Sequence, residues 1–127
     1  MTPQEIIYLA SLHRFINGGI SWEQYVEFSK DWQFISYHGG VVMQKDNEVH
    51  CGALAGVHGR WLTRKFIRQI FEPIIYTYGY AKTVAFENDI NKEFIERLGF
   101  QLVRVQDGLA YYEMYHVPYS KRGDVCQ

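Results

Sequence analysis

The sequence lacks the features that mark several common classes of protein. It has two cysteines, Cys51 and Cys126, in 127 residues, which is too few for a disulfide framework. We interpret both as free thiols of a reducing compartment. No apolar run approaches the roughly 20 residues of a membrane span, and the opening Met1–Glu5 does not have the pattern of a signal peptide. The expected location is therefore the cytoplasm.

Charge of one sign is also missing. The net charge is -1, so nothing global predicts binding to nucleic acid or to a membrane. The histidines do not have the spacing of metal ligands, so no metal is expected. What the chain has in quantity is hydrophobic residues, 47%, of which many are aromatic, 17% of the chain. This composition predicts one folded domain with one core, and some of the aromatic area is expected to serve an interface.

The first half of the chain reads as two short helices followed by three strands. Thr2–Glu5 and Ser21–Gln24 are capping boxes, which open helices. Asn17-Gly18-Gly19 is expected to stop the first helix, and the second is expected to end near Lys30. Aromatic and β-branched runs then predict strands over residues 32–37, 41–44 and 48–57, with turns at Gly39–Gly40 and Asp46–Asn47.

The second half begins with the longest amphipathic helix, predicted over residues 62–78, where apolar residues keep a 3–4 spacing. Gly79 is its expected C-cap, and Pro73 is expected to kink it or reset its last turns. A strand over 82–87 and a short helix ended by Gly99 follow. Two strands over 100–105 and 109–115, joined by a turn at Asp107–Gly108, complete the order α-α-β-β-β-α-β-α-β-β.

A helix between the third and fourth strands implies one parallel pair in a mostly antiparallel sheet. The expected fold is therefore a mixed α/β (α+β) domain over residues 1–115, followed by a polar tail over 116–127.

This order, ending in Glu96-Arg97-Leu98-Gly99-Phe100, resembles the GNAT superfamily of N-acetyltransferases. In that superfamily an asparagine after the fifth strand precedes a helix that ends in Leu-Gly-Phe, as Asn88 does here. The resemblance covers about residues 32–115 in topology and 57–100 in sequence. The segment Trp61–Arg68, followed by Tyr78, is most similar to small GNAT-like proteins of tailed bacteriophages, one group of which is described as internal virion or assembly proteins. A phage origin would place the protein in the host cytoplasm or the virion.

The resemblance implies a binding site for acetyl-CoA around the start of the long helix. Backbone groups of three residues would contact the pantetheine arm, and the start of the helix would hold the pyrophosphate. The residues implied are Leu54, Ala55 and Val57 for the arm, and Arg60, Thr63, Arg64, Lys65 and Asn88 for the remainder. The plainer interpretations are a buried strand end for the first group and a solvated helix face for the charged residues.

Two departures from the family pattern count against catalysis. The pyrophosphate loop of the family has glycine or alanine where Thr63 and Lys65 stand, so side chains crowd the approach to the backbone N–H groups. The second departure is Ile95, which occupies the position, seven after Asn88, where a tyrosine commonly protonates the leaving thiolate. Isoleucine has no proton to give.

Acyl transfer to an amine also needs a base. Glu48 and His50 alternate onto one face of the predicted strand over 48–57, and either could act through a water molecule. The alternative is an exposed polar strand face. For the acid, Tyr111 and Tyr112 are candidates that nothing singles out.

Two classes of function stay open. The first is a GNAT-fold protein with little or no catalysis, which binds a protein partner or its own copies as a virion or assembly component. The second is an acetyl-CoA-dependent N-acyltransferase. The aromatic residues of the early helices and the last hairpin are expected to form part of a self- or partner interface, in particular Trp22, Tyr25, Tyr111, Tyr112 and Tyr115.

Overall fold

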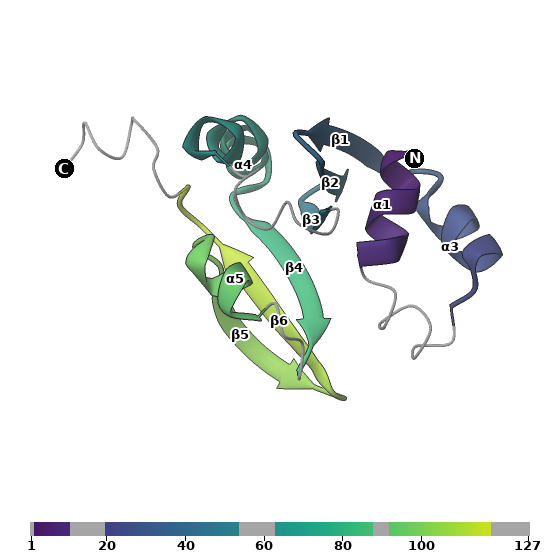
Figure 1. The fold of residues 1–127 in the computed structure, drawn as a ribbon. Coiled ribbons are helices and arrows are strands. Elements are labelled where there is room, and N and C mark those ends of the chain that lie inside the picture. The colour runs from purple at the N-terminus through teal and green to yellow at the C-terminus, as the bar shows by residue number, and fades with distance from the viewer. Residues whose placement is uncertain (1, 11–19, 54–62, 88–91, 118–127) are drawn as a thin grey trace. The chain divides into compact units, whose positions relative to one another are not determined.

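The computed structural model describes residues 2–10, 20–53, 63–87 and 92–117 (Figure 1). The chain forms two compact units, one of Met1–Lys45 with Val49–Leu62 and the other of Asp46–Glu48 with Thr63–Gln127. The predicted order of elements is confirmed. The elements are α1 (Pro3–Ala10), α3 (Trp22–Ser29), β1 (Gln33–Tyr37), β2 (Gly40–Lys45), β3 (Glu48–Ala53), α4 (Arg64–Tyr78), β4 (Ala81–Phe86), α5 (Lys92–Arg97), β5 (Gln101–Gln106) and β6 (Leu109–Met114).

Six strands form one sheet in the order β1-β2-β3-β4-β6-β5. The pairs β1/β2, β4/β6 and β5/β6 are antiparallel, and β3 pairs with β4 in parallel, with Glu48 opposite Lys82. The predicted parallel pair in a mostly antiparallel, mixed α/β sheet is therefore confirmed. The parallel pairing of β3 with β4 is possible because helix α4 connects them. A connection between parallel strands has to cross over and return the chain to the end of the sheet at which the first strand began.

The first two helices begin as the sequence predicts. The Thr2 hydroxyl accepts a hydrogen bond from the Glu5 backbone N–H (3.1 Å), and the Glu5 carboxylate accepts one from the Thr2 N–H (2.9 Å). Ser21 and Gln24 form the same reciprocal pair at the start of α3. Each pair satisfies two N–H groups that a helix start leaves without intrahelical partners.

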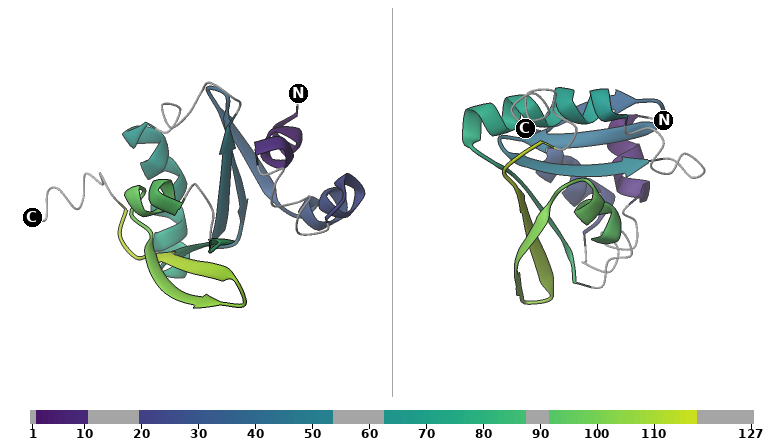
Figure 2. Two further views of the ribbon diagram at one scale, coloured as in Figure 1. Left: turned by 60° about the horizontal axis from the view of Figure 1, so that its bottom comes forward. Right: turned by 90° about the vertical axis from the view of Figure 1, so that its left-hand side faces the viewer.

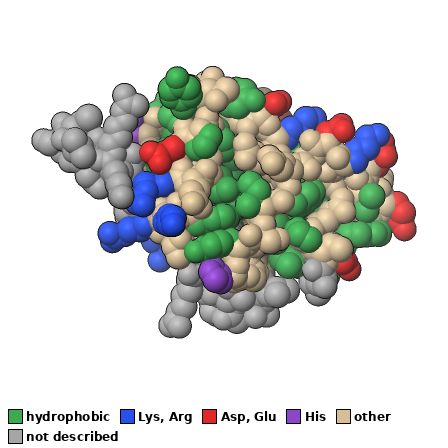
Figure 3. Space-filling model, turned by 90° about the horizontal axis from the view of Figure 1, so that it is seen from above, with side chains coloured by type: hydrophobic (Ala, Val, Ile, Leu, Met, Phe, Trp, Pro, Cys, Tyr) green, Lys and Arg blue, Asp and Glu red, His purple; other side chains and the backbone are tan. Residues whose placement is uncertain are grey.

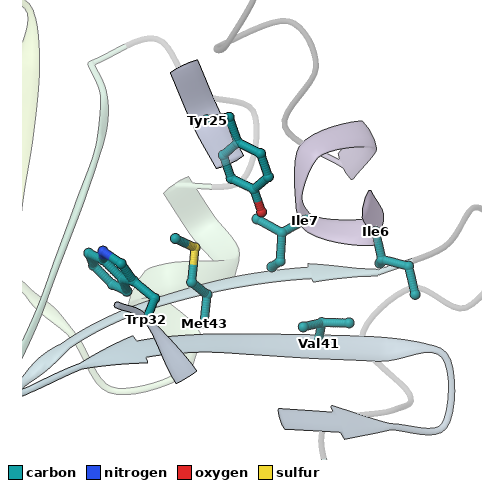
Figure 4. Close-up of a cluster of buried hydrophobic side chains, with 6 residues drawn as sticks. All are labelled: Ile6, Ile7, Tyr25, Trp32, Val41 and Met43. Carbon is teal, nitrogen blue, oxygen red and sulfur yellow. The ribbon is translucent and has the colours of Figure 1, made fainter. Parts of the chain in front are cut away.

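The core of the first unit lies between these helices and the strands β1 and β2 (Figure 4). Two partly buried hydrogen bonds join the helices, because the Tyr25 hydroxyl donates to the Gln4 carbonyl (2.8 Å) and the Gln4 side chain donates to the Ser29 hydroxyl (2.7 Å). The cluster consists of Ile6, Ile7, Tyr25, Trp32, Val41 and Met43.

One predicted turn is placed one residue too late. The expected turn residues were Gly39 and Gly40, but Gly40 already pairs with Tyr37 in the strands, and the turn residues are His38 (φ 49°) and Gly39 (φ 84°). A two-residue hairpin turn of this type needs positive φ at both positions, and the strand register decides which residues take it. The turn predicted at Asp107–Gly108 is confirmed, with φ values of 54° and 78°.

The second unit is built on α4 and the strands β4, β6 and β5. The helix runs through Pro73 and ends at Gly79, which has the left-handed φ of 88° and donates its N–H to the Ile75 carbonyl (2.8 Å). Phe71 of α4 meets Phe100 edge to face, with ring centroids 5.7 Å apart. The left panel of Figure 2 shows α4 and α5 on the same side of these strands. The buried residues of this core are Phe66, Ile67, Ile70, Phe71, Ile74, Ala81, Ala85, Leu98, Phe100, Ala110, Tyr112 and Met114.

Candidate functional site

The first turn of α4 is the part of the expected cofactor site that the structure describes best. Thr63 is the N-cap residue, and its hydroxyl accepts a hydrogen bond from the Phe66 backbone N–H at 3.1 Å. The Thr63 carbonyl accepts the first intrahelical bond, from the Ile67 N–H at 2.9 Å. The threonine side chain therefore already satisfies one of the N–H groups that a helix start offers to an anion.

The neighbouring cations lie in solvent. Thr63, Arg64 and Lys65 are all exposed, which agrees with the plainer interpretation of a solvated helix face. Figure 3 shows Lys and Arg side chains on one face of the molecule together with Asp and Glu side chains.

The two candidate bases lie on β3, at alternating positions. Glu48 is half-buried and stands opposite Lys82 of β4. His50 is half-buried, with its ring centroid 5.6 Å from that of Trp32. An aromatic side chain therefore lies against His50 on this face of the strand. Their role as bases stays a prediction.

Two residues after His50, Gly52 brings helix and strand into unusually close contact. A Cβ atom added at Gly52 would lie 2.9 Å from the Ala10 Cβ and 3.2 Å from the Ile7 Cδ1. A glycine inside a strand often marks a bulge or a close approach of another segment, but it does not identify that segment.

The candidate acids differ from each other in burial. Tyr112 is 1% exposed and belongs to the core of the second unit, whereas Tyr111 is half-buried and carries the Arg104 guanidinium 4.0 Å from its ring centroid. Ile95 is a half-buried residue of α5. Burial raises the pKa of the Cys51 thiol to about 12, so this thiol is protonated at neutral pH and is a poor nucleophile.

The remaining predicted residues are not covered by the structure. Leu54, Ala55, Val57, Arg60 and Asn88 lie outside the described residues. Across the described ranges there is no group of three His, Cys, Asp or Glu side chains that could hold a metal ion. In those ranges no helix is long and apolar enough to cross a membrane.

The aromatic residues expected at an interface divide into two sets. Tyr25 is fully buried and Tyr112 is 1% exposed, each inside the core of its own unit. Trp22 and Tyr115 are exposed by 36% and 51%, and Tyr111 is half-buried. The predicted interface therefore depends on these last three residues.

A solved structure with the same arrangement decides the fold. The crystal structure at 1.46 Å resolution of an acetyltransferase of the GNAT family from Listeria monocytogenes 4b F2365 superimposes with a TM-score of 0.54 and 9% identity. The match covers 88% of this chain and 86% of that one. The chain has a GNAT-type fold. No protein-family model matches the sequence, and the search of curated proteins found no match.

The resemblance implies the pyrophosphate site at the start of α4. Thr63 and Lys65 stand where the family pattern has glycine or alanine, and the Thr63 hydroxyl accepts the hydrogen bond of one backbone donor, the Phe66 N–H. The residues at this turn therefore do not fit the backbone cradle that the resemblance implies. A Ser or Thr directly before an apolar helical run is the local signal that identifies such a cap.

Proposed function

We propose that this protein is a GNAT-fold, phage-type protein with weak or no acyl transfer, which acts as a binding or virion-assembly component. The observation that carries the proposal is the hydrogen bond from the Phe66 N–H to the Thr63 hydroxyl, at 3.1 Å. It supports a helix start that is closed by its own side chain. A diphosphate would have to displace the threonine hydroxyl before it could reach this donor.

The magnitudes also favour the capped state. Loss of an N-cap side chain costs about 1 kcal/mol, and a diphosphate would have to recover this before gaining net affinity. Side-chain cations can hold phosphate without backbone donors, but Arg64 and Lys65 are exposed, where ion pairs contribute only about 0–1 kcal/mol each. The substitution of Ile95 for the expected tyrosine supports the same proposal, since acyl transfer also needs an acid for the thiolate.

An acetyl-CoA-dependent N-acyltransferase is the second candidate. It is favoured by the printed description of the structural neighbour as an acetyltransferase and by the two candidate bases, Glu48 and His50, on β3. In this function Arg60, Arg64 and Lys65 would hold the phosphates through their side chains.

Calorimetric titration with acetyl-CoA separates the two functions. We expect no binding up to millimolar cofactor. Micromolar binding that is abolished by Arg60→Ala and Arg64→Ala, while the control Arg68→Ala on the same helix leaves it unchanged, would overturn the proposal in favour of the enzyme.

A gain-of-function variant tests the structural reason. Thr63→Gly with Lys65→Gly places glycines where the family pattern has glycine or alanine, and removes the cap from the Phe66 N–H. If the cap is what blocks the phosphates, this variant binds acetyl-CoA more tightly than the parent. Thr63→Ser, which keeps the capping hydroxyl, is the matched control and is expected to behave as the parent does.

A further inference from the structure

The strands β4 and β6 present two faces of opposite character. Toward the core, the side chains are 0–7% exposed; these are Ala81, Thr83 and Ala85 on β4 and Ala110, Tyr112 and Met114 on β6. The alternating residues on the other face are half-buried or exposed. We call these the β4–β6 outer face: Lys82, Val84, Phe86, Leu109, Tyr111 and Glu113.

Strand register arranges the outer face in three rows. Lys82 stands opposite Glu113, Val84 opposite Tyr111, and Phe86 opposite Leu109. Directly opposite residues of an antiparallel pair have their Cβ atoms about 4.5–5.5 Å apart. The face therefore consists of two adjoining apolar rows and one charged row, in which Lys82 stands between Glu113 of β6 and Glu48 of β3.

Aromatic side chains surround the face, and they contact each other and neighbouring charged side chains. Beyond the charged row, Tyr80 and Tyr115 stack with ring centroids 5.4 Å apart, and the Tyr115 hydroxyl donates to the Glu113 carboxylate at 2.6 Å. On the β5 side, Arg104 lies over the Tyr111 ring. Phe86 is 39% and Tyr115 is 51% exposed, although aromatic residues of this size are usually buried. Such a face, with adjoining apolar rows beside a charged row, has the mixed apolar and polar composition of a protein interface.

The positions of the Lys82 and Glu113 charges favour a second copy of this chain as the partner. Consider a two-fold axis that runs parallel to the strands, between β4 and β6 and between the sheets of two copies. This axis places each β4 residue of one copy over the β6 residue of the second copy with which it pairs inside a single chain. Lys82 of each copy then meets Glu113 of the other, and Val84 meets Tyr111 across the axis. The face is thus its own electrostatic complement, which an isologous dimer requires.

We propose that the β4–β6 outer face binds the same face of a second copy of this chain, with two reciprocal Lys82–Glu113 pairs beside an apolar centre. Two sheets packed face to face lie about 10 Å apart with their strands within about 30° of each other. Side chains of the length of lysine and glutamate meet across that distance, and the phenylalanine, valine and tyrosine side chains fill the centre.

Mass measurement of the full chain tests this directly. In sedimentation velocity or light scattering, we expect the mass of two chains at hundreds of micromolar and a shift toward one chain on dilution. The mass of one chain throughout this range would overturn the proposal. This result is independent of the acetyl-CoA titration, so the failure of one proposal is not the failure of the other.

Charge reversal tests the arrangement. Lys82→Glu and Glu113→Lys each place like charges across the axis, so each variant alone should raise the dimer Kd by ~10-fold or more, equivalent to ~1.4 kcal/mol. Mixed in equal amounts, the two variants should associate, because position 82 of each copy then faces a position 113 of opposite charge in the other copy. The opposing residues within each chain stay like-charged in the mixture, so only contact between copies can produce this recovery.

Matched controls keep the test specific. Lys92→Glu and Glu93→Lys reverse two exposed charges on α5 and should leave the dimer Kd unchanged, alone or mixed. Phe86→Ser should weaken the dimer, whereas Tyr76→Ser, which removes an aromatic residue that is 88% exposed on α4, should not. A mixture of Lys82→Glu and Glu113→Lys that stays monomeric when the parent is dimeric would overturn the proposed arrangement.

Discussion

Gly52 is the position where one added methyl group has the most clearly defined consequence. In Gly52→Ala the new Cβ would lie 2.9 Å from the Ala10 Cβ. Favourable carbon–carbon contacts lie at about 3.5–4.0 Å, so the surfaces of α1 and β3 must separate by roughly 0.5–1 Å. The Ile7 Cδ1, at 3.2 Å, is the end of a flexible side chain and can move away. The Ala10 Cβ is fixed to the helix and can move only with it.

The expected loss of stability follows from two opposing terms. Overpacking of this kind costs about 1–3 kcal/mol, and replacing glycine by alanine in a strand returns about 0.5–1 kcal/mol of conformational entropy. With the middle of each range, the net change is a loss of about 1 kcal/mol. For a chain of this length that corresponds to a fall in Tm of about 3–5 °C, and to a fall of about 0.5 M in the urea midpoint.

Urea unfolding followed by tryptophan fluorescence measures this change, since Trp22 and Trp32 lie in the same unit as Gly52. The decisive comparison is the double variant Gly52→Ala with Ala10→Gly, which moves the methyl group from the helix to the strand. Ala10→Gly alone costs up to about 1 kcal/mol of helix propensity. The double variant should be more stable than the sum of the single effects by about 1 kcal/mol or more. An unchanged midpoint for Gly52→Ala, or strict additivity, would refute the reasoning.

Two further predictions concern a helix cap and a thiol. Gly99→Val should lower the free energy of unfolding by about 1 kcal/mol or more, because Gly99 has a φ of 109° that β-branched residues rarely adopt; an unchanged Tm in a thermal melt would contradict this. The pKa of Cys51 is raised from 9.0 to about 12 in the folded state, so the folded chain keeps a proton that the unfolded chain releases. The free energy of unfolding that depends on this protonated thiol is fully present below about pH 9. It is lost as the pH rises toward 12, at a rate of at most ~1.4 kcal/mol per pH unit. In urea titrations at pH 8 and pH 10.5, the parent should therefore lose more stability than Cys51→Ala does, and an equal loss in both would contradict the prediction.

The order of elements and most of their ends could be read from the sequence, because they depend on contacts between residues close in the chain. The Ser21–Gln24 box predicts the start of α3, and Gly79 and Gly99, which both have positive φ, are predicted as helix ends. Register was harder to predict. The turn at His38–Gly39 was placed one residue late, since three neighbouring residues offered two similar turns and only pairing with β2 selects between them.

The position of the candidate site could be predicted from the sequence, but the hydrogen bonding at that position could not. The sequence predicts Thr63 as an obstacle to phosphate, whereas its hydrogen bond to the Phe66 N–H depends on the start of the helix at Arg64. For Tyr25 and Tyr112, aromatic content alone could not separate an interface residue from a core residue. Burial is decided by what packs against a side chain, and that packing comes from segments distant in the chain.

Capping residues, hydrophobic periodicity and one helix between two parallel strands are therefore enough to predict the fold. Which surfaces the fold leaves available depends on packing between segments that are distant in the chain. The charges of Lys82 and Glu113 are 31 positions apart in the sequence and become neighbours solely through the pairing of β4 with β6. The close approach of Ala10 to Gly52 arises in the same way, from long-range packing that no local pattern encodes.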